Sequence, residues 1–142
     1  MLSLLAGNGR CYCGLMGAVD ILLVDEDHRS LVDLAGLLEE AGFIASTATH
    51  AYEALQSVAT RAIGAIVTEV SLSGMSGFEL MIALRSAHPD VPVIVMSAHP
   101  TPEGRAIALE LGAIAYVSKP VSVLLFLDAL TRALAPARPS CN

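Results

Sequence analysis

Several short apolar runs in this chain end in, or lead directly into, polar side chains that could take part in chemistry. In chain order these side chains are Asp25 with Glu26, then Glu69, Ser97 and Lys119. Carboxylates suit a hard cation such as Mg²⁺, which takes oxygen ligands and keeps several waters. A hydroxyl and an ammonium suit the oxygens of a phosphoryl group. The residue types therefore predict a site for a magnesium ion and a phosphoryl group.

The elements that must position these side chains follow from the hydrophobic pattern. Short β-branched runs alternate with amphipathic segments, which is typical of repeated βα units around a parallel sheet. The predicted strands cover residues 21–24, 43–48, 65–70, 93–97 and 115–117. Apolar stripes at helical spacing cover 31–38 and 51–62, and further helices are predicted at 77–87, 102–111 and 122–135.

The order of these elements tells where the polar residues should meet. In an open parallel α/β sheet, ligands bind beyond the carboxyl ends of the strands, where loops and helix amino termini converge. Each candidate residue ends a predicted strand or follows one directly. We therefore expect the carboxylates, the hydroxyl and the ammonium to share one edge of the sheet.

Length and charge narrow the class of protein. A chain of 142 residues with 54% hydrophobic content suits one buried domain, which we place at residues 18–135, after an unassigned extension (1–17) and before a tail (136–142). The net charge of -6 disfavours nucleic-acid binding. The sequence shows neither an apolar run of about 20 residues nor the pattern of a secretory signal. We expect no membrane contact and a cytoplasmic location.

Four motifs carry a resemblance to a known family. They are "ILLVDED", "AIVTEVSLSGMSGFEL", "VPVIVMSA" and "GAIAYVSKP". In order and approximate spacing they resemble the receiver domain of bacterial two-component response regulators, over nearly all of residues 19–135. The resemblance implies an α/β fold with a five-stranded parallel sheet in the order 2-1-3-4-5 and helices on both faces, the flavodoxin-like winding.

The resemblance also implies roles for the residues at the predicted edge. In the family, a histidine kinase's phosphoryl group passes to an aspartate that ends the third strand, beside Mg²⁺ held by an acidic pair. Asp25 and Glu26 match the acidic pair, and the metal site would include Glu69 and Ser71. Ser97 matches the hydroxyl residue that moves toward the phosphoryl group.

Three further positions match the motif near the end of the domain. Lys119 resembles the lysine that pairs with the phosphoryl group, and the bond between Lys119 and Pro120 would be cis. Tyr116 matches the aromatic residue whose rotation reports activation.

Glu69 departs from the family pattern, because it stands where the phosphoacceptor aspartate is expected. Ser73 and Ser76 also replace the proline and aspartate that are common in the following loop. Phosphoryl transfer depends on positioning and charge neutralisation. One extra methylene displaces the carboxylate by about 1 Å, which can cost on the order of 100-fold in rate. The longer acid also reaches toward the place of the phosphoryl group, where its charge would partly imitate an acyl phosphate.

Three interpretations follow. The first is a single-domain receiver in two-component phosphorelay signalling, a pseudo-receiver that acts through protein contacts, with weakened or lost Mg²⁺ binding and no enzymatic activity. The second is a receiver still phosphorylated at Glu69 or nearby, as at Ser71. The third is a small phosphohydrolase of the haloacid dehalogenase type, suggested by the Asp25-x-Asp27 pair. It lacks the expected last acidic pair, since only Asp128 follows Lys119 at a distance, inside a predicted helix.

Partners would be a histidine kinase or another signalling protein. In the family, the surface formed by the fourth helix, fifth strand and fifth helix, here residues 102–111, 115–117 and 122–135, binds partners or a second copy. The core stripe of the last helix is predicted to be Val123, Phe126, Leu127, Leu130 and Leu134. Leu124 and Leu125 lie off this stripe, so with Tyr116 they form a candidate interaction patch that could also mediate homodimerisation. The alternative is that they pack against adjacent loops.

Overall fold

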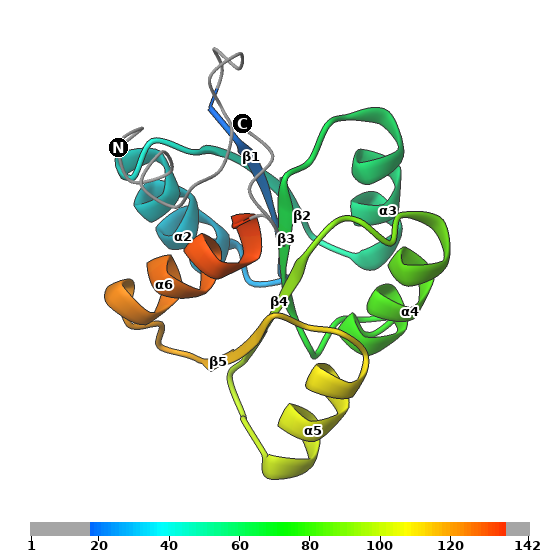
Figure 1. Cartoon of the computed structure of the whole chain (residues 1–142). Coiled ribbons are helices and arrows are strands. Elements are labelled where there is room, and N and C mark those ends of the chain that lie inside the picture. The colour runs from blue at the N-terminus through cyan, green and yellow to red at the C-terminus, as the bar shows by residue number, and fades with distance from the viewer. Residues whose placement is uncertain (1–17, 136–142) are drawn as a thin grey trace.

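A computed structural model describes residues 18–135, which form a five-stranded parallel sheet with helices on both faces (Figure 1). The strands are β1 (Asp20–Val24), β2 (Ile44–Ala48), β3 (Ala65–Glu69), β4 (Val93–Ser97) and β5 (Ala115–Ser118). Their order is β2-β1-β3-β4-β5 and every neighbouring pair is parallel. The predicted fold class is confirmed. The predicted extension (1–17) and tail (136–142) lie outside the described residues.

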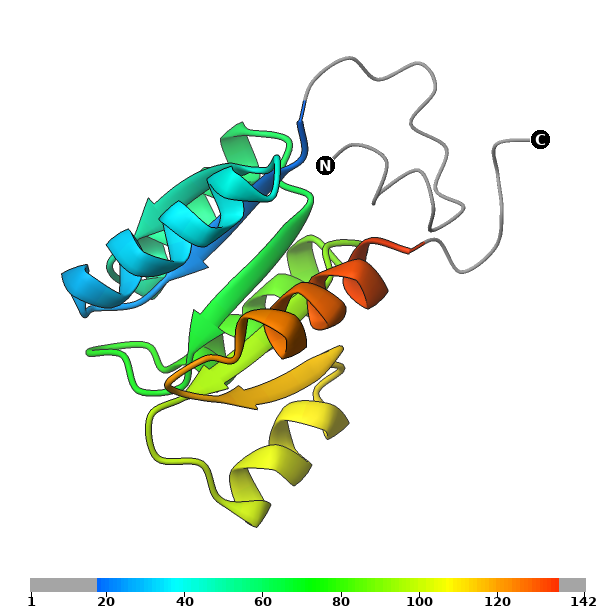
Figure 2. The ribbon, with the colours of Figure 1, turned by 90° about the vertical axis from the view of Figure 1, so that its left-hand side faces the viewer.

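Helices cover both faces of the sheet (Figures 1 and 2). The first layer contains α2 (His28–Glu40) and α6 (Val123–Leu134); the second contains α3 (Ala51–Thr60), α4 (Gly77–Ala87) and α5 (Pro102–Glu110). Alternate residues of β1 serve the two cores: Leu23 packs in the cluster with Phe126, and Leu22 in the cluster with Leu80. The central strands are continuously apolar because both of their faces are buried.

The predicted elements agree closely with the observed ones. Strand 93–97 and helix 77–87 have the predicted bounds, and the other strands differ by one residue at one end. Asp27 caps α2 by accepting the Arg29 N–H at 3.1 Å. Within residues 18–135, no helix is long and apolar enough to cross a membrane.

The prediction for Val123 is wrong. The helical pattern predicts this residue in the core stripe of the last helix, but it is 45% exposed. It is the first residue of α6, and Val121 in the preceding loop packs against the core cluster instead. The rest of the stripe holds, with three buried residues and the partly buried Leu127.

The loop after β3 depends on two glycines. Gly74 has φ +77°, a conformation that side chains rarely adopt. A Cβ on Gly77 would lie 2.3 Å from the Glu69 carbonyl oxygen, so α4 begins directly against the end of β3. Ser76 and Glu79 form a capping box at this helix start. The loop thus returns the chain tightly over the strand end that carries Glu69.

Candidate functional site

Polar side chains from four strand ends lie at the carboxyl edge of the sheet, where the sequence predicts them. Asp25 follows β1, Glu69 ends β3, Ser97 ends β4 and Lys119 follows β5. Asp25 is 3% exposed, and Glu69 and Ser97 are each 5% exposed. Buried charges are costly unless they are paired and hydrogen-bonded. The partners of these buried side chains therefore determine what the site can bind.

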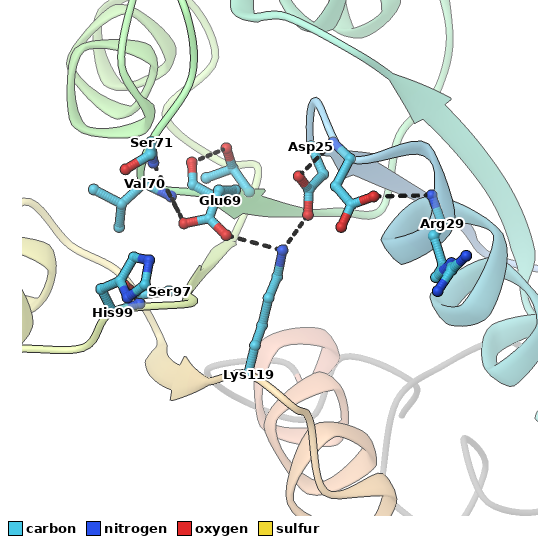
Figure 3. A network of polar contacts seen from close by, with 10 residues as sticks. Asp25, Arg29, Glu69, Val70, Ser71, Ser97, His99 and Lys119 are labelled. Atoms are coloured by element: carbon cyan, nitrogen blue, oxygen red, sulfur yellow. Dashed lines mark hydrogen bonds and ion pairs between the residues drawn. The ribbon is translucent and has the colours of Figure 1, made fainter.

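Lys119 joins two of these strand ends. Its Nζ donates to Asp25 Oδ2 and lies 2.9 Å from Glu69 Oε1 (Figure 3). Burial of the amine lowers the pKa of Lys119, but the bonds to Asp25 and Glu69 outweigh burial and raise it above the ordinary value. The chain's only lysine is therefore held as a cation between two buried carboxylates.

The second carboxylate oxygen of Glu69 accepts hydrogen bonds from the backbone of the next two residues. Oε2 accepts the Val70 N–H at 2.9 Å and the Ser71 N–H at 3.3 Å (Figure 3). The side chain is long enough to fold back over these amides while Oε1 reaches Lys119. Both oxygens of the carboxylate are thus engaged.

The two adjacent acids of the first strand end diverge. Asp25 stays in the site, with Oδ1 accepting the Asp27 N–H at 2.9 Å. Glu26 is exposed, and its Oε2 accepts the Ser73 N–H from the β3–α4 loop. Hydrogen bonds from the Ser73 hydroxyl and backbone lower the pKa of Glu26. Glu26 therefore links two loops and does not join Asp25.

The hydroxyl and aromatic candidates have other partners. Ser97 Oγ accepts the His99 N–H at 3.1 Å (Figure 3). The Tyr116 hydroxyl lies over the start of α5, where it accepts the Thr101 N–H at 3.3 Å. A Cβ on Gly104 would lie 2.8 Å from that hydroxyl.

The remaining predicted residues lie around this edge or on the nearby surface. Ser71 is exposed beside Glu69, and the bond between Lys119 and Pro120 is cis. Leu124 and Leu125 are 81% and 65% exposed, at the start of α6.

A magnesium ion does not fit this arrangement of side chains. Mg²⁺ requires near-octahedral oxygen ligands, but the Lys119 ammonium is bonded to the carboxylates of both Asp25 and Glu69. Glu26 faces Ser73. Within residues 18–135, no group of three or more acidic, histidine or cysteine side chains is placed to hold a metal.

Sequence reasoning did not identify two features of the site. The replacement of proline by Ser73 signals an extra backbone N–H donor, but it does not show that Glu26 accepts from it. No residue pattern predicts that the backbone amides of Val70 and Ser71 donate to Glu69.

The fold and the edge site together define a class of protein. A doubly wound parallel sheet with carboxylates, a hydroxyl and an ammonium at its carboxyl edge is typical of domains that handle phosphoryl groups or nucleotides there. Residues 21–131 match the response regulator receiver domain. The chain belongs to this family.

Known relatives are consistent with the family match. The chain is 34% identical over 123 residues to the nitrogen assimilation regulatory protein NtrX of Azorhizobium caulinodans, covering 85% of this chain and 27% of that protein. It is 38% identical over 120 residues to the transcriptional regulatory protein PrrA of Mycobacterium tuberculosis, covering 84% and 51%. The chain therefore spans about half or less of the length of these two relatives.

Solved structures agree on the fold. A signal receiver domain of an HD domain-containing protein from Pseudomonas fluorescens superposes with a TM-score of 0.78 at 30% identity, covering 82% of this chain and 94% of that one. A CheY-like receiver domain from Methanospirillum hungatei gives 0.78 at 26% identity, covering 83% and 94%.

Proposed function

We propose that this receiver domain signals through protein contacts without phosphorylation of Glu69. The observation that carries the proposal is the engagement of both Glu69 oxygens, one by Lys119 and the other by the Val70 and Ser71 amides. A phosphoryl group on this side chain would need cationic and amide donors to neutralise its oxygens. The unmodified carboxylate already uses such donors.

Glu69 in this proposal replaces the phosphoacceptor aspartate and partly imitates the phosphorylated state. The imitation rests on Lys119 and on the Val70 and Ser71 amides, whereas the Ser97 hydroxyl oxygen accepts the His99 N–H. Magnesium binding is weakened or lost, since the Lys119 ammonium already neutralises the two buried carboxylates.

Intact-mass spectrometry after incubation with acetyl phosphate and magnesium tests the proposal. We expect no phosphate adduct on the wild type or on Ser71→Ala. Glu69→Asp shortens the acid by one methylene, but Glu26 still bonds Ser73 and Asp25 still bonds Lys119 in this variant, so we expect at most a slow gain of adduct. A stoichiometric wild-type adduct that disappears in Glu69→Ala would refute the proposal and favour phosphorylation at this position. An adduct that disappears in Ser71→Ala would favour the neighbouring serine.

The phosphohydrolase interpretation has no support from the site. It requires a second acidic pair near the lysine, but Asp128 lies on α6 with its side chain 64% exposed and paired with Arg132 at 3.2 Å. The family match also places residues 21–131 among receivers.

The partner in this proposal is a histidine kinase or another signalling protein. The candidate surface is formed by α5, β5 and α6, where Leu124 and Leu125 are exposed beyond the core stripe. Large exposed apolar side chains that adjoin each other favour a protein interface. The same surface would serve a homodimer. The net charge of -6 supports a protein partner over a nucleic acid.

A further inference from the structure

The β1–α2 and β3–α4 loops are connected by one acidic side chain. Glu26 and Ser73 are 47 positions apart in the sequence, and the Ser73 N–H donates to Glu26 Oε2. Asp25, the neighbouring acid, is buried in the edge site and bonded to Lys119. The two adjacent carboxylates after β1 thus have different partners. Asp25 contacts Lys119, and Glu26 contacts the β3–α4 loop.

The donor in this connection is a backbone group that depends on the residue type at position 73. Proline has no backbone N–H, so a chain with proline there could not make this bond. Serine supplies the N–H that donates to the Glu26 carboxylate. Hydrogen bonds to an ionised acceptor are stronger than neutral ones.

We propose that Ser73 is a positioning residue whose N–H holds Glu26 on the β3–α4 loop, and that this contact, together with the Lys119 ammonium, keeps divalent cations out of the edge site. The inference rests on the proposed function and extends it, because it names the residue that disables the metal site. Hard cations prefer several carboxylate or carbonyl oxygens at once. With Glu26 bonded elsewhere, Asp25 and Glu69 remain, and both already contact Lys119.

Ser73→Pro in the full chain tests the proposal. Binding of Mn²⁺, followed by the electron paramagnetic resonance signal of the free ion, reports affinity without any phosphorylation step. We expect Ser73→Pro to bind Mn²⁺ about tenfold or more tightly than the wild type, as when a supporting contact of a metal site is changed. The matched control is Ser73→Ala, which keeps the N–H and loses the hydroxyl. It should lie closer to the wild type than to Ser73→Pro.

Glu26→Gln identifies the side chain responsible. In the Ser73→Pro background it should remove the gain, because the released carboxylate is the added ligand. In the wild-type background it should change Mn²⁺ affinity by less than about threefold, because Glu26 is not a ligand there. The second comparison needs no proline variant, so it holds even if Ser73→Pro fails to fold.

Three results would overturn the proposal. The first is equal Mn²⁺ affinity for the wild type and a folded Ser73→Pro protein. The second is a gain in Mn²⁺ affinity in Ser73→Pro that survives Glu26→Gln, and the third is a loss of about tenfold on Glu26→Gln alone. None of them depends on whether Glu69 accepts a phosphoryl group, which the acetyl phosphate experiment measures separately.

Discussion

Replacing Lys119 by methionine should strongly destabilise the fold, because it removes the ammonium that lies between two buried carboxylates. Methionine keeps most of the apolar stem, so the change isolates the charge. Asp25 and Glu69 are 3% and 5% exposed and contact the same ammonium. Two hydrogen-bond lengths place their oxygens within about 6 Å of each other.

The magnitude follows from that geometry. At an effective dielectric constant of about 20, two negative charges about 6 Å apart repel by about 3 kcal/mol. Breaking a buried ion pair from one side typically costs about 3–5 kcal/mol. Because the Lys119 side chain is 17% exposed, water can partly replace it, and we expect a loss of about 2–4 kcal/mol. A domain with a typical free energy of unfolding of about 5–15 kcal/mol stays folded after such a loss, so the loss can be measured.

Urea denaturation at neutral pH, followed by far-UV circular dichroism, measures this loss. Glu69→Gln is the matched variant: it leaves one ammonium with one carboxylate, so its free energy of unfolding should change by about 1 kcal/mol or less. The double variant Lys119→Met/Glu69→Gln should recover at least about 1.5 kcal/mol relative to Lys119→Met. A loss below about 1 kcal/mol for Lys119→Met, or simple additivity in the double variant, would refute the reasoning.

Three other predictions concern pH, Tyr116 and the exposed leucines. The pKa of Lys119 is raised in the folded state, so the stabilisation by its charge is complete below the ordinary value of 10.5 and is lost as pH rises through the folded-state value. The difference in unfolding free energy between wild type and Lys119→Met should therefore be constant from about pH 7 to 9 and shrink above about 10.5. A difference that already shrinks below about pH 9 would contradict this prediction. Gly104→Ala should shift the ring proton resonances of Tyr116, because the new Cβ would lie 2.8 Å from the Tyr116 hydroxyl. The control is Gly36→Ala, on the exposed side of α2 with nothing within 4 Å, which should leave these resonances unchanged and stabilise the fold by about 0.5–1 kcal/mol. Unchanged Tyr116 resonances in Gly104→Ala would show that the ring lies elsewhere. Leu125→Glu should leave stability within about 0.5 kcal/mol but weaken self-association measured by analytical ultracentrifugation, and unchanged association, or a monomeric wild type, would dismiss the homodimer.

Much of the fold was predictable because its signals are local. Continuously apolar strands indicate burial on both faces, and β4 (Val93–Ser97) has the predicted bounds. The edge residues Asp25, Glu69 and Lys119 could be predicted to meet, since parallel strands bring their carboxyl ends to one side. The prediction that Val123 belongs to the core stripe is wrong, because helical spacing does not show how far the start of a helix extends beyond the core.

The sequence by itself determined which groups stand at the edge of the sheet, including the glutamate at the end of β3 and the only lysine of the chain. Only the tertiary structure decided how these groups pair. Glu69 accepts the Val70 and Ser71 N–H groups and also contacts Lys119. Glu26 accepts the Ser73 N–H and does not join Asp25 in the site. The physical reason is that each carboxylate has several donors within reach, and the choice depends on how loops distant in sequence approach each other.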